Sequence, residues 1–161
     1  MSADNQQERL DGNWISGFRD GEGCFHVSIN RISEMSLGWQ VLPEFRIVQH
    51  EKDESVLYKI KDYFGFGDVK INRTDNHGTR KGFRVRGMNN LNRLIEFFNK
   101  YPLNTSKAND FKIFSQIINL MNNKEHLTKQ GLDKIAKLIS EMNRKPSPKY
   151  LESSETIRLT S

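Results

Sequence analysis

Residues 14–23, Trp-Ile-Ser-Gly-Phe-Arg-Asp-Gly-Glu-Gly, constrain the fold more than any other part of this 161-residue chain. Ile15 and Phe18 lie one turn apart and indicate a helix, which leads into a glycine-rich turn that holds Glu22. A strand pattern begins directly afterwards. This arrangement presents a carboxylate at a helix end with little side-chain bulk around it, which suits the holding of a metal ion close to a bulky anionic substrate.

Two glycines of this string, Gly17 and Gly21, lie four residues apart and therefore on one helix face. Each costs the helix roughly 1 kcal/mol relative to alanine. The close approach of another backbone explains such spacing, as in helix pairs with small residues at every fourth position. A bare Gly-Glu-Gly would more simply be a helix end with a solvated glutamate, but the full string favours a paired helix that carries a functional acid.

Alternation of apolar and polar residues indicates four half-buried strands. The apolar positions are Phe25, Val27 and Ile29, then Phe45 and Ile47, then Val69 and Ile71, and last Phe83 and Val85. Helical stripes lie between the two strand pairs and after the last strand. The expected order is therefore helix, two strands, helix, two strands and further helices, an α+β fold in one domain over residues 1–143 with an extended tail over residues 144–161.

The connections between paired strands are predicted from turn residues. One loop is expected over residues 31–38 and another over residues 74–82, the latter around the turn Asn76-His77-Gly78. Pro43 indicates a bulge or a sheet edge in the second strand, since proline cannot donate a ladder hydrogen bond. In that strand Glu44 and Arg46 alternate with the apolar residues and are expected on its polar face.

The polar strand faces form a candidate DNA-binding surface. One solvated face is common in antiparallel sheets, so a single basic residue there means little. Together, however, these faces supply donors and acceptors that suit base edges and phosphates, and a curved antiparallel ribbon fits the major groove. The candidate contact residues are His26, Ser28, Asn30, Arg46, Lys70, Asn72, Arg84 and Arg86.

Charge and composition agree with a nucleic-acid partner. The net charge is +5 and the isoelectric point is about 9.3, which favours a polyanionic partner without identifying one. A single cysteine, Cys24, excludes a disulfide framework, and the four histidines show no zinc-site spacing. No apolar run is long enough for a membrane helix, and the first residues are not typical of a signal or transit peptide, so we expect an intracellular protein.

The string from Ile15 to Gly23 resembles the signature of the LAGLIDADG homing endonucleases at all nine positions. Phe18 corresponds to the aromatic variant of that signature, and Glu22 stands where an aspartate is equally common. The resemblance runs from about Trp14 to Met142 and includes three supporting segments, at residues 45–53, 101–107 and 123–128.

The resemblance implies a homodimer that cuts double-stranded DNA. In this family the signature helices of two half-molecules pack together and each delivers one acid to the DNA. One copy of the signature implies a symmetric pair of chains, with Ile15, Gly17, Phe18 and Gly21 at the interface. Glu22 and the backbone carbonyl of Gly21 would bind Mg²⁺, whose preferred ligands are hard oxygens. Ca²⁺ is expected to support binding without cleavage.

Two further residues match the periphery of the family's active site. Gln49 would orient solvent around the metal, and Lys107 would stabilise charge near the scissile phosphate. Each could instead be an ordinary surface residue. By the same resemblance, the reaction would be Mg²⁺-dependent cleavage of both strands at a long, partly palindromic site, leaving 3′ overhangs. The gene would lie in an intron of an organelle or of a bacterial genome.

Three alternatives remain open at this point. An intron maturase of the same family would bind intron RNA, with or without nuclease activity. A non-catalytic RNA-binding sheet is suggested weakly by Lys81-Gly-Phe-Arg-Val85, although the aromatic residues and the element order of that class are missing. The chain could also be half of a larger enzyme with two signatures, in which case it would remain a monomer.

Overall fold

The computed structural model describes the chain from Asp11 to Met142, without the side chains of residues 19–22. The tail predicted over residues 144–161 lies outside the described residues. The chain folds into two compact units: the first contains residues up to Cys24 together with Glu44–Thr105, and the second contains Phe25–Pro43 together with the residues from Ser106 onward. The single domain predicted over residues 1–143 stays a prediction.

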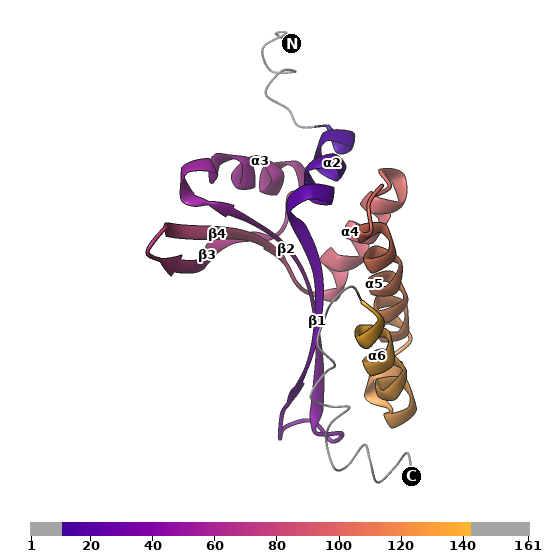
Figure 1. Ribbon diagram of the computed structural model, residues 1–161. Coiled ribbons are helices and arrows are strands. Elements are labelled where there is room, and N and C mark those ends of the chain that lie inside the picture. The colour runs from indigo at the N-terminus through magenta and orange to yellow at the C-terminus, as the bar shows by residue number, and fades with distance from the viewer. Residues whose placement is uncertain (1–10, 143–161) are drawn as a thin grey trace. The chain divides into compact units, whose positions relative to one another are not determined.

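Helices and strands follow one another in the predicted order, which confirms the α+β class (Figure 1). The elements are α2 (Gly12–Glu22), β1 (Gly23–Arg31), β2 (Trp39–His50), the 3-10 turn η1 (Glu51–Asp53), α3 (Ser55–Phe64), β3 (Asp68–Asp75), β4 (Gly78–Val85), α4 (Met88–Lys100), α5 (Lys107–Asn122), the 3-10 turn η2 (Glu125–Leu127) and α6 (Lys129–Glu141). The strands form one sheet in the order β1-β2-β4-β3. No helix within residues 11–142 combines the length and apolarity needed to cross a bilayer.

The core of the first unit lies on one face of the paired strands β2 and β4. Phe45 pairs with Val85 and Ile47 with Phe83, and all four side chains are fully buried. Helix α3 packs over the β3–β4 hairpin (Figure 1), where Phe64 stacks on Phe83 at 6.0 Å between ring centroids. Since opposite residues of antiparallel strands point to the same face, the alternate residues of these strands lie on the face away from this core.

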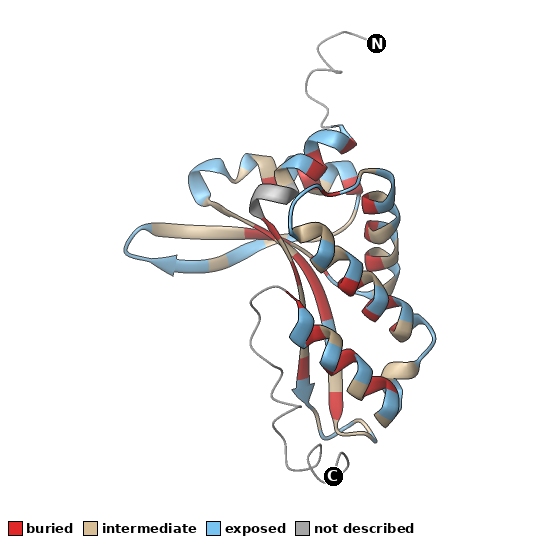
Figure 2. Cartoon of the chain, turned by 45° about the vertical axis from the view of Figure 1, so that its right-hand side comes forward, coloured by how far each residue is buried: buried red, intermediate tan, exposed pale blue. Residues whose placement is uncertain are grey.

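The β3–β4 hairpin is longer than the sequence pattern indicates. Asp75 pairs with Gly78, so only two residues form the turn, and the loop predicted over residues 74–82 is wrong. A carboxylate oxygen of Asp75 accepts the backbone N–H of His77 at 2.8 Å and stabilises this short turn. Figure 2 shows the outer part of the hairpin as exposed or half-buried residues.

Strand β3 contains a register shift after Ile71, and Ile71 itself is exposed although the sequence pattern predicts it to be buried. Ile71 pairs with Lys81 and Arg73 with Arg80, so Asn72 is an extra residue and forms a β-bulge. Ile71 is 61% exposed instead of buried. It lies on the outer part of the hairpin, beyond the buried pairs that end at Phe83.

The second unit packs β1 and the adjoining part of β2 with helices α5 and α6. The ring of Phe25 on β1 lies 4.9 Å from that of Phe114 on α5, measured between centroids. Buried residues form stripes along α5 and α6 (Figure 2). The Thr128 hydroxyl caps α6 by accepting the backbone N–H of Gly131 at 3.0 Å. Pro43 is the last residue of β2 that belongs to this unit. The pairing of β2 with β4 begins two residues later, at Phe45.

Gly131 provides a test of the packing at the start of α6. A Cβ at this position would overlap the backbone carbonyl of Glu125. Alanine normally favours a helix over glycine by roughly 1 kcal/mol. Here we expect Gly131→Ala to destabilise the protein by about 2 kcal/mol or more, because overpacking against backbone cannot relax cheaply.

Equilibrium urea unfolding measures the effect on the free energy of unfolding. Lys137→Ala is the control, since Lys137 is an exposed residue of the same helix and its replacement should change the free energy of unfolding little. An equal or greater stability of the Gly131→Ala protein would show that the turn η2 moves freely away from α6.

Candidate nucleic-acid interface

Helix α2 has an inner face that belongs to the protein core. Ile15 is fully buried, and the hydroxyl of Ser16 lies 2.8 Å from the carbonyl oxygen of Tyr101 and 3.1 Å from that of Pro102. A Cβ at Gly12 would overlap the ring of Tyr101. The side chain of Ile15 therefore packs inside its own chain, and its predicted place at a dimer interface stays a prediction.

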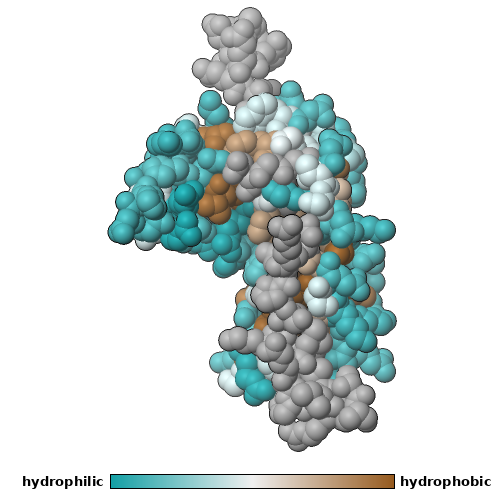
Figure 3. Space-filling model, viewed as in Figure 1, coloured by the Kyte–Doolittle hydropathy of each residue, from teal (hydrophilic) through white to brown (hydrophobic). Residues whose placement is uncertain are grey.

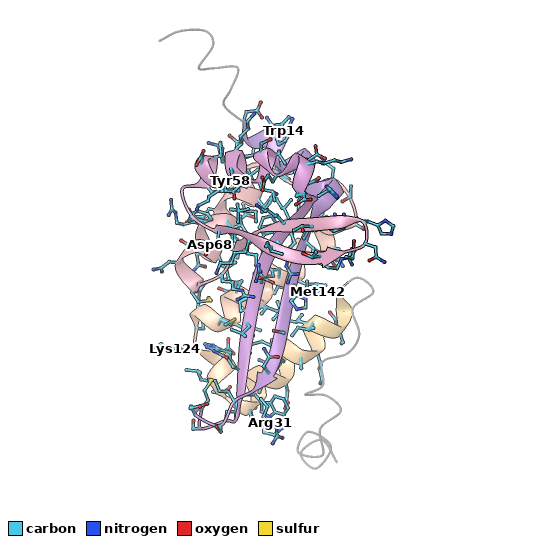
Figure 4. All side chains as sticks on the ribbon, turned by 90° about the vertical axis from the view of Figure 1, so that its left-hand side faces the viewer. Trp14, Arg31, Tyr58, Asp68, Lys124 and Met142 are labelled. Atoms are coloured by element: carbon cyan, nitrogen blue, oxygen red, sulfur yellow. The ribbon has the colours of Figure 1, made fainter. Side chains whose placement is uncertain are left out.

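The outer face of α2 is open. Trp14 is 44% exposed and its ring stacks on that of Phe18, with 5.2 Å between centroids and 7° between planes. A Cβ added to Gly17 would meet no described atom within 4 Å. Together with Gly21, these residues follow the i, i+3, i+4, i+7 spacing of one helix stripe. Trp14 and Tyr58 lie on the helical side of this unit, whereas Asp68 lies on its sheet (Figure 4).

The candidate acid stands where α2 passes into the sheet. Gly21 and Glu22 are the last two residues of α2, and β1 begins at Gly23 without a connecting loop. The side chain of Glu22 lies outside the described residues. Its backbone position nevertheless follows from the two elements, since the end of α2 coincides with the beginning of β1.

The two other candidate catalytic residues lie in different units. Gln49 is half-buried near the end of β2, opposite Lys81 and on the core-facing side of the strand. Because β1 and β2 are antiparallel neighbours, the end of β2 and the beginning of β1 lie at the same end of the sheet (Figure 1). Lys107 is half-buried at the first residue of α5, in the second unit. The catalytic roles of Gln49 and Lys107 stay predictions.

The register gathers polar residues of the first unit on one sheet surface, which we call the basic face. Arg46 pairs with Arg84, Lys70 with Gly82 and Arg73 with Arg80, so these side chains leave the sheet on the side opposite the core. Figure 3 shows hydrophilic side chains over the hairpin that carries much of this face. The basic face consists of Arg46, Lys70, Asn72, Arg73, Arg80 and Arg84.

The remaining predicted DNA contacts lie outside the basic face. His26 and Ser28 on β1 are half-buried and Asn30 is exposed, and the Asn30 amide donates to the Ser28 hydroxyl at 3.2 Å. These three residues belong to the second unit. Arg86 is exposed but follows the last residue of β4, and it is bound to a carboxylate of its own unit.

Sequence reasoning missed two arginines of the basic face. An uninterrupted alternation in β3 would place Arg73 on the apolar face, and Arg80 lies within the loop predicted over residues 74–82. The residues Asn76-His77-Gly78 correctly indicated a turn. A hairpin with a two-residue loop at this turn would have placed Arg80 on a strand.

Glu44 lies on the same face of β2 as Arg46, as the alternation predicts, but it is only 3% exposed. One of its oxygens accepts from Nη2 of Arg46 at 2.6 Å, and the other accepts from Nε of Arg86 at 3.0 Å. Burial alone would raise the pKa of Glu44, but the hydrogen bonds and positive charges of the two arginines outweigh burial and lower it below its ordinary value. The i, i+2 spacing of Glu44 and Arg46 on one strand face is the signal that could have predicted this pair.

The donor types at the end of α2 are chemically suited to a hard divalent cation. The Gly21 carbonyl and the Glu22 carboxylate are oxygen ligands of the kind that Mg²⁺ prefers. No group of three or more His, Cys, Asp or Glu residues that could hold a metal ion occurs among the residues whose side chains are described.

Comparisons with known proteins agree with this architecture. The crystal structure of the homing endonuclease I-TnaI superposes with a TM-score of 0.84 at 44% identity, covering 95% of this chain and 99% of that one. The structure of I-SmaMI bound to an uncleaved DNA target in the presence of calcium ions superposes with a TM-score of 0.82 at 32% identity, covering 89% of this chain and 48% of that one. The fold is that of the homing endonucleases.

The sequence comparison is more specific. Residues 15–118 match the LAGLIDADG endonuclease family. A relative from Neurospora crassa, described as probable intron-encoded endonuclease 3, is 36% identical over 132 residues, which are 81% of this chain and 24% of the relative. The chain belongs to the LAGLIDADG endonuclease family, and it spans about a quarter of the length of that curated relative.

The buried carboxylate predicts how stability depends on pH. Because the pKa of Glu44 is lowered in the folded protein, its ion pairs stabilise the fold above the ordinary glutamate pKa of about 4.3, and this contribution is lost as the pH falls through and below that value. We expect Glu44→Gln to cost about 2 kcal/mol at pH 7, since the hydrogen bonds are charge-assisted.

Urea unfolding of both proteins between pH 7 and pH 3 measures this difference. The gap in the free energy of unfolding should narrow on acidification, because the wild-type carboxylate becomes protonated and resembles the amide. A gap that stays constant over this range would show that Glu44 is not ionised in the folded state.

Proposed function

We propose that this chain acts as a homodimer that cuts both strands of DNA at a specific site. The observation that carries the proposal is the combination, in one unit, of an acid-bearing helix with an open glycine face and a sheet with a basic face. The first feature suits pairing with a second acid-bearing helix, and the second suits a nucleic-acid backbone and its base edges. Membership of the endonuclease family and the DNA-bound structure of I-SmaMI support this reading.

A second copy of this chain is the proposed occupant of the outer face of α2. This chain corresponds to nearly all of I-TnaI but to 48% of I-SmaMI, whose chain is thus about twice the matched length. Two copies of this chain would equal one chain of the longer kind. In a twofold pair, Trp14, Gly17, Phe18 and Gly21 would meet their own counterparts, and the two Glu22 residues would come side by side.

Magnesium is the proposed cofactor. Glu22 and the Gly21 carbonyl of each chain would hold it, with Gln49 orienting solvent and Lys107 placing a positive charge near the scissile phosphate. A divalent cation at such a site supplies Lewis-acid stabilisation of the charge that develops on phosphoryl oxygens. Calcium would support binding without cleavage, a reading supported by the calcium-containing complex of I-SmaMI with uncleaved DNA.

The proposed target follows from twofold symmetry. Two identical basic faces would contact two half-sites, so the target would be long and partly palindromic, and cleavage would leave 3′ overhangs. The intron-encoded relatives support an intron as the location of the gene and an organelle as the compartment. An intron maturase that binds RNA is the alternative, and cleavage of duplex DNA by the purified chain would decide between the two.

The Glu22→Gln substitution tests the catalytic assignment. Incubation of the wild-type protein with a randomised duplex library and Mg²⁺ first recovers the cleaved site. On that site, Glu22→Gln should lower the cleavage rate by about a thousandfold or more, since metal-assisted charge stabilisation is worth several kcal/mol. Binding in Ca²⁺, measured by fluorescence anisotropy, should remain within a few-fold of wild type.

Glu141→Gln is the control for this experiment, because Glu141 is an exposed residue at the end of α6. It should cut at the wild-type rate. Wild-type cleavage by the Glu22→Gln protein would remove Glu22 from the active site, and binding of intron RNA with no cleavage of any duplex would favour the maturase.

The Gly17→Ala substitution tests the dimer. The added methyl group meets no described atom of its own chain, so the fold should be as stable as wild type or slightly more stable. In a closely paired dimer the methyl groups would separate the helices, and we expect at least a tenfold weaker dimerisation. Sedimentation equilibrium measures the association, and a wild-type chain that stays monomeric at all concentrations would contradict the homodimer.

A further inference from the structure

Arg46 is the basic-face residue whose guanidinium is held by two other side chains. Its Nη2 donates to a carboxylate oxygen of Glu44 at 2.6 Å, and its Nη1 donates to the amide oxygen of Asn72 at 3.1 Å. The two partners come from different strands, Glu44 from β2 and Asn72 from the bulge in β3. The guanidinium is therefore fixed from two sides, although the Arg46 side chain remains 32% exposed.

The stem of Arg46 also has a defined path. A Cβ at Gly82 would lie 3.6 Å from Cγ and 3.7 Å from Cδ of Arg46, and 3.7 Å from Cβ of Asn72. The side chain thus crosses β4 over a residue that has no side chain of its own. The bulge at Asn72 brings the amide to the far side of this crossing. Strand register, bulge and glycine together determine where the guanidinium lies.

The bound guanidinium still has hydrogen-bond donors to offer. Arginine carries five N–H groups, of which Nε–H is buried here without a partner among the described residues. Of the four N–H groups on the two Nη atoms, Glu44 and Asn72 each engage one. The other two remain, one on each Nη atom.

We propose that Arg46 reads a guanine in the major groove, through O6 and N7, and that Glu44 and Asn72 are positioning residues for this contact. The proposal rests on the DNA-binding function proposed above and specifies one part of it. Guanine presents two acceptors side by side, and arginine is its commonest bidentate partner. A guanidinium that is held before binding loses little side-chain entropy when the contact forms.

The same geometry argues against a phosphate contact. A phosphate is attracted mainly by net positive charge, and the nearby carboxylate of Glu44 reduces that charge. Glu44 also binds Arg86 at 3.0 Å, so one buried acid offsets part of the charge of two arginines. A base edge depends instead on the direction of the donors, which Glu44 and Asn72 control. The positive potential that Glu44 removes around Arg46 is therefore no obstacle to a hydrogen-bonded contact with a base edge.

The test compares Arg46→Ala, Glu44→Gln and the double variant on the recovered target site. Binding to the site and to all of its single base-pair variants is measured in Ca²⁺. Arg46→Ala should abolish a preference for G·C at one position of each half-site, a loss of about 5- to 150-fold in discrimination. Glu44→Gln should weaken the preference at the same position, and the double variant should lose no more than Arg46→Ala alone.

The affinity for unrelated duplex DNA is the second quantity to measure. It should change in Glu44→Gln in a way that a purely structural role of Glu44 does not predict. Glu44→Gln removes one negative charge beside the basic face. Binding to unrelated DNA should therefore strengthen and depend more steeply on salt. Glu96→Gln is the control, because it removes one acid from an exposed position on α4 of the same unit. It should leave the base preferences unchanged.

Several outcomes would overturn the inference while leaving the proposed function intact. If Arg46→Ala weakens binding equally on all base variants, Arg46 contacts a phosphate. If Glu44→Gln keeps every base preference, the carboxylate does not position Arg46. Should Glu44→Gln fail to fold, Asn72→Ala replaces it, with the same position expected to relax. A wild-type protein that binds no duplex would contradict the proposed function itself.

Discussion

The two-faced packing of helix α2 is the constraint on which the rest of the molecule depends. Its inner face is held by the buried Ile15, by the hydroxyl of Ser16 against the chain at Tyr101, and by the absence of a side chain at Gly12. Its outer face is open at Gly17. One face of the helix is therefore packed against the protein, and the other is exposed. Its last residue is Glu22, and β1 begins at the next residue. Any loosening of the inner face would move that acid.

The basic face shows a second kind of organisation, in which a buried charge orders exposed ones. Glu44 is nearly inaccessible and binds two arginines, one of which is also bound by Asn72. Removing a carboxylate from water is costly, and the cost is offset here only because both oxygens have cationic partners. Sheet register brings these groups together. The surface that would meet DNA is thus built from directed donors as well as from net charge.

The sequence patterns predicted burial correctly where it depends on neighbours along the chain, and failed where it depends on residues packed from elsewhere in the fold. Alternation correctly predicted the buried residues of β1 and the core pairs of β2 and β4. Along these residues one face of each strand is covered by the core and the other is not, so the period of two matches the surroundings. It failed for Ile71, which keeps the predicted alternation but lies on the outer part of the hairpin, beyond the buried pairs that end at Phe83. Ile15 was assigned to an interface from its place in a motif, whereas the packing of the helix inside its own chain decides its burial.

The sequence alone determined the family, the order of helices and strands and the identity of the candidate acid, because these follow from a short motif and from periodicity along the chain. Tertiary structure alone decided which face of α2 is open, that Asn72 binds Arg46 from another strand and that Glu44 also binds Arg86. Each of these depends on residues that are far apart in the chain and are brought together by strand register and side-chain packing, and no local pattern encodes such contacts.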